Sequence, residues 1–338
     1  MDCVQPFVDE RIETLAEVLD PIALAKHLRA VSQAPWNGGG VEEARAVRVI
    51  RHNVGKRCTL EIGVRTGDNW HFLIAKVYRK DRTKVFQTMD AIQRAGFGSQ
   101  HEFSIPEPVA YLPSLRLLLQ EKVEGQVAGE VFKSGDEQSQ AEAAERCARW
   151  LARFHALAPR TGSVTSPLDH LNSKSMQRYS EKIAQRGGSL AERAAWLHER
   201  LEDAASSLSS AEVCGGHGSY SAAHVLLAQG RTVVFDWDGY DVADPARDVA
   251  RFLAALRREA LGRGSIRALD GVAEVFIRTY FAVGQPIAER NLRFFEAATC
   301  LNLAKHSLCR PIPDWQVKQE KADAMLEESL RVFEREAA

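Results

Sequence analysis

The sequence predicts an α+β protein with two lobes, a small β-rich lobe followed by a larger helical lobe. Short segments rich in Val, Ile, Leu, Thr and aromatic residues, separated by turn residues, dominate the stretch from 44 to 123. After Gly125 apolar residues recur at helical spacing, and one short β segment, 213–238, interrupts the helices. The length of 338 residues is enough for two domains of about 100–200 residues each.

Residues 1–43 are predicted to form a helical extension at the N-terminus. Asp20-Pro21 is a helix start signal, because a carboxylate at the N-cap accepts backbone hydrogen bonds and proline suits the first helical position. The run Gly38-Gly39-Gly40 then breaks the chain and is predicted to be a linker.

Residues 44–124 are predicted to form the β-rich lobe. Gly55-Lys56 and Gly67-Asp68-Asn69 have the chemistry of hairpin turns and separate the first three strands. One helix and two more strands follow, which makes about five strands. The predicted strands are 44–54, 57–66, 70–78, 108–112 and 115–123, and the predicted helix is 84–95.

Residues 125–338 are predicted to form the helical lobe. One helix follows from the spacing of Cys147, Trp150, Leu151, Phe154 and Leu157. Others are predicted over 191–208, 245–257, 272–283, 289–308 and 317–334. Within the β segment, residues 225–228 and 232–235 are joined across Gln229-Gly230 and predict a hairpin.

The charge balance argues against a protein that holds nucleic acid or an anionic membrane by bulk electrostatics. Lys and Arg number 44 and Asp and Glu number 45, so the formal net charge is −1. No run reaches the about 18 apolar residues of a membrane span, and the acidic N-terminus lacks the apolar region of a signal peptide. The six cysteines are scattered, without a C-x-x-C pair, which is typical of reduced thiols. We therefore expect a cytoplasmic protein that binds neither nucleic acid nor membranes.

The segment 214–248 carries the chemical signal of the chain. It can be laid over the kinase catalytic loop, H-R-D-x-x-x-x-N, which is followed by a hairpin and a metal-binding aspartate. His217 matches the first position of the loop. Ser219 stands where the catalytic aspartate belongs, and His224 stands where the metal-binding asparagine belongs. After the predicted hairpin, Asp236 takes the place of the metal-binding aspartate.

The order of motifs upstream agrees with this alignment. Lys76 lies on the third predicted strand, where kinases keep the phosphate-pairing lysine, and Gly55 would lie over the nucleotide phosphates. The chain resembles the aminoglycoside phosphotransferase / choline kinase-like family, a small-molecule branch of the protein-kinase-like fold. The motifs that carry the resemblance are His217-Gly218-Ser219, Asp236-Trp237-Asp238, Asp244-Pro245-Ala246-Arg247-Asp248 and the helical segment 151–157.

The resemblance implies a bilobal protein-kinase-like fold, ATP and Mg²⁺ as cofactors, and a small-molecule acceptor in the helical lobe. The catalytic residues it implies are Ser219, His217 and Asp236, and the metal ligands are Asp236 and His224. The nucleotide-binding residues are Lys76, Gly55, Asp90, Glu121 and Val123. Asp90 is the nearest substitute for a glutamate that the helix after Lys76 lacks.

Asp248 has two interpretations. The resemblance implies an anchor, a carboxylate that accepts hydrogen bonds from the catalytic-loop backbone. Alternatively it is an acid that the helix dipole favours in the first turn after an Asp244 cap.

Two departures from the family pattern leave two functions open. A serine hydroxyl does not accept the substrate proton at neutral pH, and Mg²⁺ prefers oxygen ligands to imidazole. The first function is an ATP-dependent small-molecule phosphotransferase with an altered catalytic loop. The second is a pseudokinase, a nucleotide-binding or protein-interaction module that acts on a partner protein without phosphotransfer.

His224 accordingly has more than one interpretation. It is either an altered metal or phosphate ligand or a space-filling replacement at a lost metal site. A zinc site formed by Cys214, His217 and His224 is a further alternative, although the spacing matches no standard finger.

Overall fold

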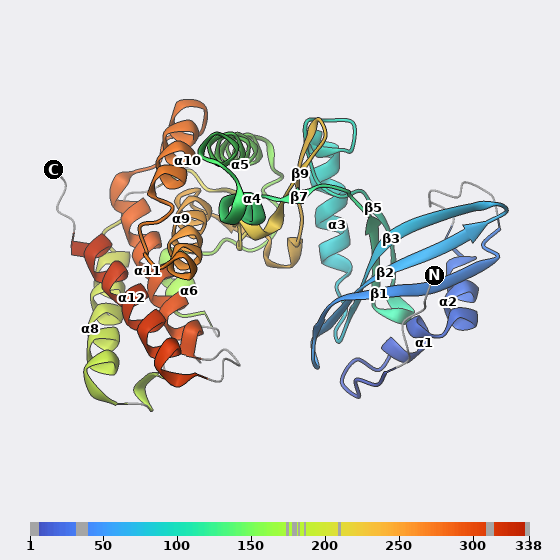
Figure 1. Ribbon diagram of the computed structural model, residues 1–338, viewed down its shortest axis with the longest axis horizontal. Helices are drawn as coiled ribbons and strands as arrows, with labels where there is room; N and C mark the ends of the chain where they lie inside the picture. Colours follow the sequence, from blue (N-terminus) through green and yellow to red (C-terminus); the bar gives the residue numbers. More distant parts are fainter. Residues whose placement is uncertain are drawn as a thin grey trace. The chain divides into compact units, whose positions relative to one another are not determined.

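The computed structural model describes residues 7–31, 40–173, 176–177, 181, 183–185, 187–208, 211–308 and 314–334. Gly38 and Gly39 of the predicted linker, and Cys3 and Cys309, lie outside the described residues. The fold is α+β, as predicted, and the chain forms two compact units (Figure 1). The first unit contains Met1–Gly125 and Ala228–Asp238, and the second contains Gln126–Leu227 and Gly239–Ala338. The predicted division near residue 124 puts all of 213–238 in the helical lobe, whereas here the end of that segment belongs to the first unit.

The first unit is built around a five-stranded antiparallel sheet. Its strands lie in the order β1 (Glu43–Asn53), β2 (Arg57–Thr66), β3 (Asn69–Tyr78), β6 (Leu117–Glu121) and β5 (Pro108–Leu112). The two predicted hairpin turns are confirmed, since Gly55 and Gly67 have φ of 67° and 56°, which glycine adopts without strain. β6 begins later than predicted because Pro113–Leu115 forms a 3-10 turn and Arg116 is left-handed before the strand starts.

The N-terminal helices pack against this sheet and share its core. Apolar side chains of α1 (Leu15–Leu19) and α2 (Pro21–Leu28) lie in one buried cluster with those of the sheet, and Figure 1 shows α2 beside β1. The Asp20 carboxylate accepts hydrogen bonds from the backbone of Ile22 and Ala23, both at 2.8 Å. The predicted helix start is therefore confirmed.

A short parallel strand pair holds residues 228–238 in the first unit. The predicted helix after β3 is α3 (Thr83–Ile92), which continues as a π turn over Gln93–Phe97. Next, β4 (Phe103–Ser104) pairs with β10 (Arg231–Val234). The sequence does not predict this pairing, and it positions the residues that follow β10, including Asp236.

The second unit is helical. It contains α4 (Ala128–Ser134), α5 (Glu137–Leu157), α6 (Pro167–Leu171), α8 (Gly188–Ala205), α9 (Ala246–Ala260), α10 (Asp270–Val283), α11 (Glu289–Leu308) and α12 (Trp315–Glu334). The helices predicted in this lobe are confirmed. α11 packs against α9 and α12, and α5 packs against α10 (Figure 1). Phe252 stacks on Phe276 with ring centroids 3.9 Å apart, which ties α9 to α10.

Two pairs of short strands shape the loop regions of the second unit. β8 (Cys214–Gly216) pairs with β11 (Asp241–Ala243), and β7 (Gln126–Val127) pairs with β9 (Val225–Ala228). Since β8 leads into His217 and β11 leads into α9, the first pair brings the predicted catalytic loop beside the start of α9. No helix among the described residues is long and apolar enough to cross a lipid bilayer.

Candidate active site

The first unit brings together the two residues expected to grip the triphosphate. Lys76 lies on β3 with only 4% of its surface exposed, and its Nζ is 3.0 Å from Oδ1 of Asp236. Asp236 follows β10 and has a φ of 73°, an uncommon conformation for a residue with a side chain. A pair separated by 160 positions in the sequence is thus joined by an ion pair.

Arg57, which the sequence analysis did not assign to the site, completes this cluster. Its Nη1 donates to Oδ1 of Asp236 at 2.7 Å and also binds Oδ2 of Asp238. Lys76 lies 3.9 Å from the same Asp238 oxygen. We call Arg57, Lys76, Asp236 and Asp238 the Lys76 cluster.

A signal for Arg57 was present in the strand pattern. Side chains two residues apart on a strand share one face, so Arg57 and Thr59 lie on the same face of β2. Thr59 pairs with Lys76 in the antiparallel register, which puts Arg57 on the face of the sheet that carries Lys76. What the strand pattern cannot give is the position of Asp236, and without it the role of Arg57 is not defined.

The Lys76 cluster balances two cations against two carboxylates in a largely buried setting. Burial raises the pKa of Asp236, but the charge of Lys76 and the hydrogen bond from Arg57 outweigh it, so this pKa lies far below its usual range. Burial and the neighbouring Asp236 raise the pKa of Asp238. Although burial opposes its charge, the ion pairs with Asp236 and Asp238 raise the pKa of Arg57. Asp236 therefore stays ionised and Arg57 stays charged.

The residues expected to bind magnesium do not form a set of open oxygen ligands. Asp236 already accepts hydrogen bonds from both Arg57 and Lys76. The Nδ1–H of His224 donates to the backbone oxygen of Ser219 at 3.0 Å, and the imidazole stacks on His217 with centroids 5.7 Å apart. Mg²⁺ prefers carboxylate, carbonyl and water oxygens, so this donor set fits the ion poorly. The Arg57 guanidinium binds the carboxylates of Asp236 and Asp238 instead.

Zinc is not supported by the arrangement either. Across the part of the chain that the structure describes, no three His, Cys, Asp or Glu side chains gather as a metal site would require. Cys214, His217 and His224 are all among the residues covered by that statement.

The predicted catalytic loop of the second unit is held by Asp248. Its carboxylate accepts hydrogen bonds from the backbone N–H of His217 at 2.6 Å and of Gly218 at 2.9 Å. Gly218 has a φ of 75°, and a Cβ there would overlap the carbonyl oxygen of Gly239, so only glycine fits. The prediction that Asp248 anchors the loop backbone is confirmed. Asp244, the predicted cap, accepts from the Ala246 N–H at 2.8 Å.

Ser219 faces an imidazole in this loop. Its hydroxyl lies 3.2 Å from Nδ1 of His217, a buried side chain. A hydroxyl bonded to an imidazole differs chemically from the carboxylate that kinases use at this position, because the carboxylate accepts a proton directly. The predicted catalytic loop therefore has a serine hydroxyl beside His217 where the kinase pattern has a carboxylate.

The other residues expected to contact the nucleotide have partners within the first unit. Asp90 lies 2.6 Å from Arg94, one turn along the helix, rather than beside Lys76, whose ion pairs are with Asp236 and Asp238. The carboxylate partners of Lys76 are thus Asp236 and Asp238, which follow β10. Asp90 does not take the place of the missing glutamate in this structure.

Glu121 and Val123 lie at and after the end of β6. Glu121 pairs with Arg231 at 2.9 Å, which ties β6 to the start of β10. Val123 is partly exposed in the segment after the strand.

The backbone of Gly55 is bound by a carboxylate from the N-terminal segment. Its N–H donates to Oδ2 of Asp9 at 2.7 Å, and Asp9 is 8% exposed and also pairs with His52 at 2.8 Å. The hydrogen bond from Gly55 lowers the pKa of Asp9. The glycine that is expected to lie over the nucleotide phosphates thus donates its N–H to a carboxylate of the chain itself.

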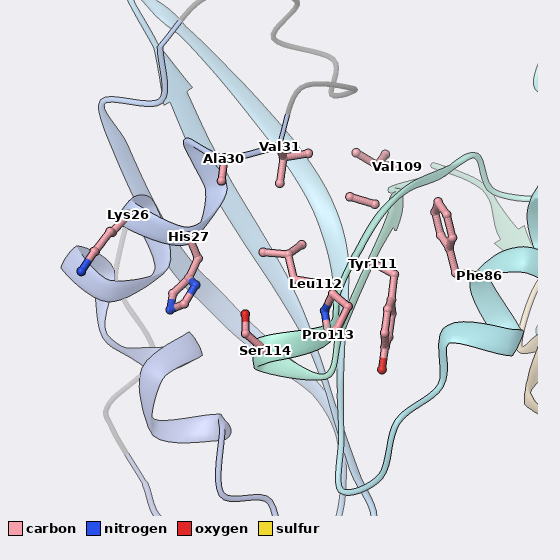
Figure 2. A pocket seen from close by; sticks show the side chains of 11 residues that line it. Lys26, His27, Ala30, Val31, Phe86, Val109, Tyr111, Leu112, Pro113 and Ser114 are labelled. Atoms are coloured by element: carbon pink, nitrogen blue, oxygen red, sulfur yellow. The ribbon is translucent and has the colours of Figure 1, made fainter.

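Two cavities bear on the search for ligand sites. A cavity of about 410 Å³ in the second unit is lined by Gly218 and Ser219 of the predicted catalytic loop. A cavity of about 470 Å³ in the first unit lies among α2, α3 and β5, and Figure 2 shows Leu112 and Val109 among its lining side chains. None of the predicted site residues lines the cavity of the first unit, so we assign that cavity no part in the site.

Comparisons with known proteins agree with this arrangement. The family model described as "Phosphotransferase enzyme family" matches residues 64–295, more than two thirds of the chain. A search of curated proteins found none that matches.

Solved structures show the same fold at low identity. A choline kinase from Cryptosporidium parvum Iowa II is 10% identical, with 91% of this chain and 94% of that chain covered and a TM-score of 0.60. A thermostable mutant of aminoglycoside phosphotransferase APH(4)-Ia, in a ternary complex with AMP-PNP and hygromycin B, is 16% identical, with 86% and 96% covered and a TM-score of 0.59. A choline/ethanolamine kinase family protein from Mesorhizobium loti is 15% identical, with 93% and 94% covered and a TM-score of 0.56. With the Lys76–Asp236 pair, the Asp248-anchored loop and the family match, the chain belongs to the phosphotransferase enzyme family.

Proposed function

We propose that the protein is an ATP-dependent small-molecule phosphotransferase with an altered catalytic loop. The observation that supports this most directly is the ion pair of 3.0 Å between buried Lys76 and Asp236. A buried lysine charge needs anionic partners, and a triphosphate is a stronger anion than one carboxylate. The loop supports the second half of the proposal, because Asp248 holds the backbone of His217 and Gly218 next to Ser219.

The chain's own residues would act mainly by positioning and charge neutralisation. Lys76 would pair with the phosphates, and Arg57 would add a second cation beside them. Phosphoryl transfer passes through a loose transition state in most analyses, so neutralising the phosphates matters more than early removal of the acceptor proton. In the loop, Ser219 would bind the acceptor hydroxyl and His217 would take up its proton.

The direct test is transfer from labelled ATP. The purified protein is incubated with γ-labelled ATP and a panel of alcohols and amino sugars, with Mg²⁺, with Mn²⁺ and with EDTA. We expect slow transfer to at least one hydroxyl compound. Absence of transfer at every enzyme level, with the fold intact by circular dichroism, would reject the phosphotransferase proposal.

Replacing Lys76 by Met is expected to remove nucleotide binding. A ligand at 100 times its Kd stabilises a protein by about 2.7 kcal/mol, which amounts to a melting shift of several degrees. We expect ATP to produce this shift in the natural protein and none in Lys76→Met. Lys84→Met, at an exposed lysine of α3, is the matched control and should keep the shift. An equal ATP shift in Lys76→Met and in the control would contradict the assigned role of Lys76.

Replacing Arg57 by Gln is expected to make nucleotide binding depend on a divalent metal. In the natural protein Arg57 already neutralises Asp236 and Asp238, so the ATP shift should be equal in EDTA and in Mg²⁺. In Arg57→Gln the two carboxylates repel the triphosphate until a metal ion binds, so the shift should appear only with Mg²⁺. The measurement is the melting temperature against ATP concentration in both buffers. An ATP shift of the natural protein that vanishes in EDTA would show that Arg57 does not replace the metal.

A second candidate is a nucleotide-binding or protein-interaction module without phosphotransfer. The observation that favours it is the state of the catalytic loop, where Ser219 is bonded to His217 and His224 to backbone. Such a module would show the ATP shift and no transfer. The double substitution described in the Discussion separates the two candidates.

A further inference from the structure

A half-buried arginine lines the cavity beside Ser219. Arg251, on α9, lines this cavity of about 410 Å³. Its Nε atom is buried without a hydrogen-bond partner, and no ion pair is present for Arg251 among the described residues. Arginine stays charged at neutral pH even where burial lowers its pKa, as it does here. A guanidinium that is partly shielded from water, with no carboxylate of the described chain at ion-pair distance, indicates a site for an anion from outside the chain.

The other charged groups around the cavity are already paired or exposed. Arg247 forms a two-pronged ion pair with Asp241, with Nη1 2.6 Å from Oδ2. Asp169 is exposed and accepts hydrogen bonds from both the backbone and the hydroxyl of Ser166 in a helix-capping box. The charge of Asp248 raises the pKa of Arg251, but the Asp248 carboxylate accepts hydrogen bonds from the loop backbone. The formal charge of the lining sums to zero, but the charge that has no ion-pair partner among the described residues is the half-buried Arg251 guanidinium.

Two uncharged polar groups of the cavity also have unmet hydrogen-bonding capacity among the described residues. His170 Nε2 and Thr299 Oγ1 both line the cavity, and both atoms are buried without a hydrogen-bond partner. Burial and the charges of Arg247 and Arg251 lower the pKa of His170 to about 4, so its imidazole is neutral at pH 7. Buried polar atoms are nearly always hydrogen-bonded in native proteins, so the unmet groups point to a polar ligand.

We propose that this cavity binds the acceptor through an anionic group, so that the substrate is a small hydroxyl compound bearing a carboxylate or a phosphate. The anion would bind the Arg251 guanidinium, with His170 and Thr299 supplying further hydrogen bonds, while a hydroxyl lies at Ser219. The volume is in the range of small-molecule sites. A polycationic acceptor is disfavoured, since it would bring positive charge against Arg251. That the ligand is the phosphate acceptor rests on the proposed phosphotransferase function. That the ligand is an anion rests on the residues of the cavity alone.

The test compares charged compounds with related neutral compounds, without ATP. Binding is measured by calorimetry and melting shift for glucuronate against glucose and for glycerol 3-phosphate against glycerol. We expect at least one anionic compound to bind about 10- to 100-fold more tightly than its neutral analogue. The carboxylate and phosphate pairs show which anion the site prefers. Equal binding of charged and neutral analogues, or binding by none of the four, would overturn the inference.

The variant Arg251→Gln keeps a polar side chain, although a shorter one, and removes its charge. We expect it to lose the preference for the anion while the ligand-free protein melts at about the same temperature, because Arg251 is half-buried and makes no ion pair among the described residues. Arg278→Gln, at an exposed position on α10, is the matched control and should bind as the natural protein does. Arg251→Lys keeps a charge without the planar fork and should retain part of the preference. An unchanged preference in Arg251→Gln would also overturn the inference.

The outcome is separable from that of the proposed function. If anion binding depends on Arg251 but the protein neither binds ATP nor transfers phosphate, the anion site is supported and the phosphotransferase proposal is rejected. Transfer from ATP to a neutral alcohol, with no preference for anions, would support the phosphotransferase and reject an anionic acceptor.

Discussion

Replacing Ser219 by Asp and His224 by Asn together is expected to raise the rate of phosphoryl transfer by about 10²- to 10⁴-fold. The Asp would supply the carboxylate that takes up the acceptor proton, which the hydroxyl of Ser219 cannot do at neutral pH. The Asn would supply an oxygen that can bind Mg²⁺. Its amide N–H can also donate to the backbone oxygen of residue 219, as His224 Nδ1 does at 3.0 Å. The loop backbone that receives both changes is already held by Asp248.

The experiment measures transfer from labelled ATP in the double variant, in each single variant and in the natural protein. Ser219→Asp alone should give most of the gain, and His224→Asn alone should give little. Ser206→Asp, at an exposed serine at the end of α8, controls for the added charge. Transfer that appears only with the double substitution supports the module without phosphotransfer as the natural function. If the double variant is folded and shifts with ATP but transfers no faster than the natural protein, the altered loop is not what limits the chemistry.

Replacing Asp248 by Asn is expected to destabilise the protein by about 3 kcal/mol and to lower its melting temperature by several degrees. The carboxylate is 1% exposed and accepts two backbone hydrogen bonds, at 2.6 Å and 2.9 Å. The Asn amide offers one oxygen in place of two and turns a donor toward a backbone N–H, which leaves a buried donor unpaired. The cost is measured by denaturant unfolding monitored by circular dichroism.

Asp270 provides a matched control for the helix-dipole interpretation of Asp248. Both acids lie in the first turn of a helix, but the Asp270 side chain is 49% exposed and pairs with Arg257. A favourable dipole position contributes about 0.3–1 kcal/mol, and an exposed ion pair contributes no more than that. If Asp248→Asn costs only as much as Asp270→Asn, the anchoring bonds add nothing to stability.

The pH dependence of stability follows from the direction of the Asp248 shift. Burial raises its pKa, but the hydrogen bond with His155 and the charge of Arg247 outweigh it, so the folded-state pKa lies well below the ordinary value of about 3.9. A carboxyl group of this kind stabilises the fold fully above its unfolded-state pKa and loses that contribution as pH falls toward the folded-state pKa. The natural protein should therefore lose stability below about pH 4 more steeply than Asp248→Asn. Parallel pH profiles of the two would contradict this origin.

Much of the fold follows from local rules that the sequence obeys. Hairpin turns at Gly55 and Gly67 and the cap at Asp20 are set by backbone conformation over a few residues, and each lies where the sequence predicts it. The long helices of the second unit follow from apolar spacing in the same way. Boundaries are less well determined, since Arg116 is left-handed after a 3-10 turn and β6 begins only after it.

The sequence by itself determined the order of elements and the identity of the altered loop, because turn chemistry, periodicity and motif spacing act over short stretches of chain. Only the tertiary structure decided which charges meet. Arg57 joins Asp236 across 179 positions, and Asp9 binds Gly55 across 46. Arg251 lines a cavity, and its Nε has no hydrogen-bond partner among the described residues. Such pairings depend on how sheets and helices pack, and packing brings together side chains whose separation in sequence carries no signal.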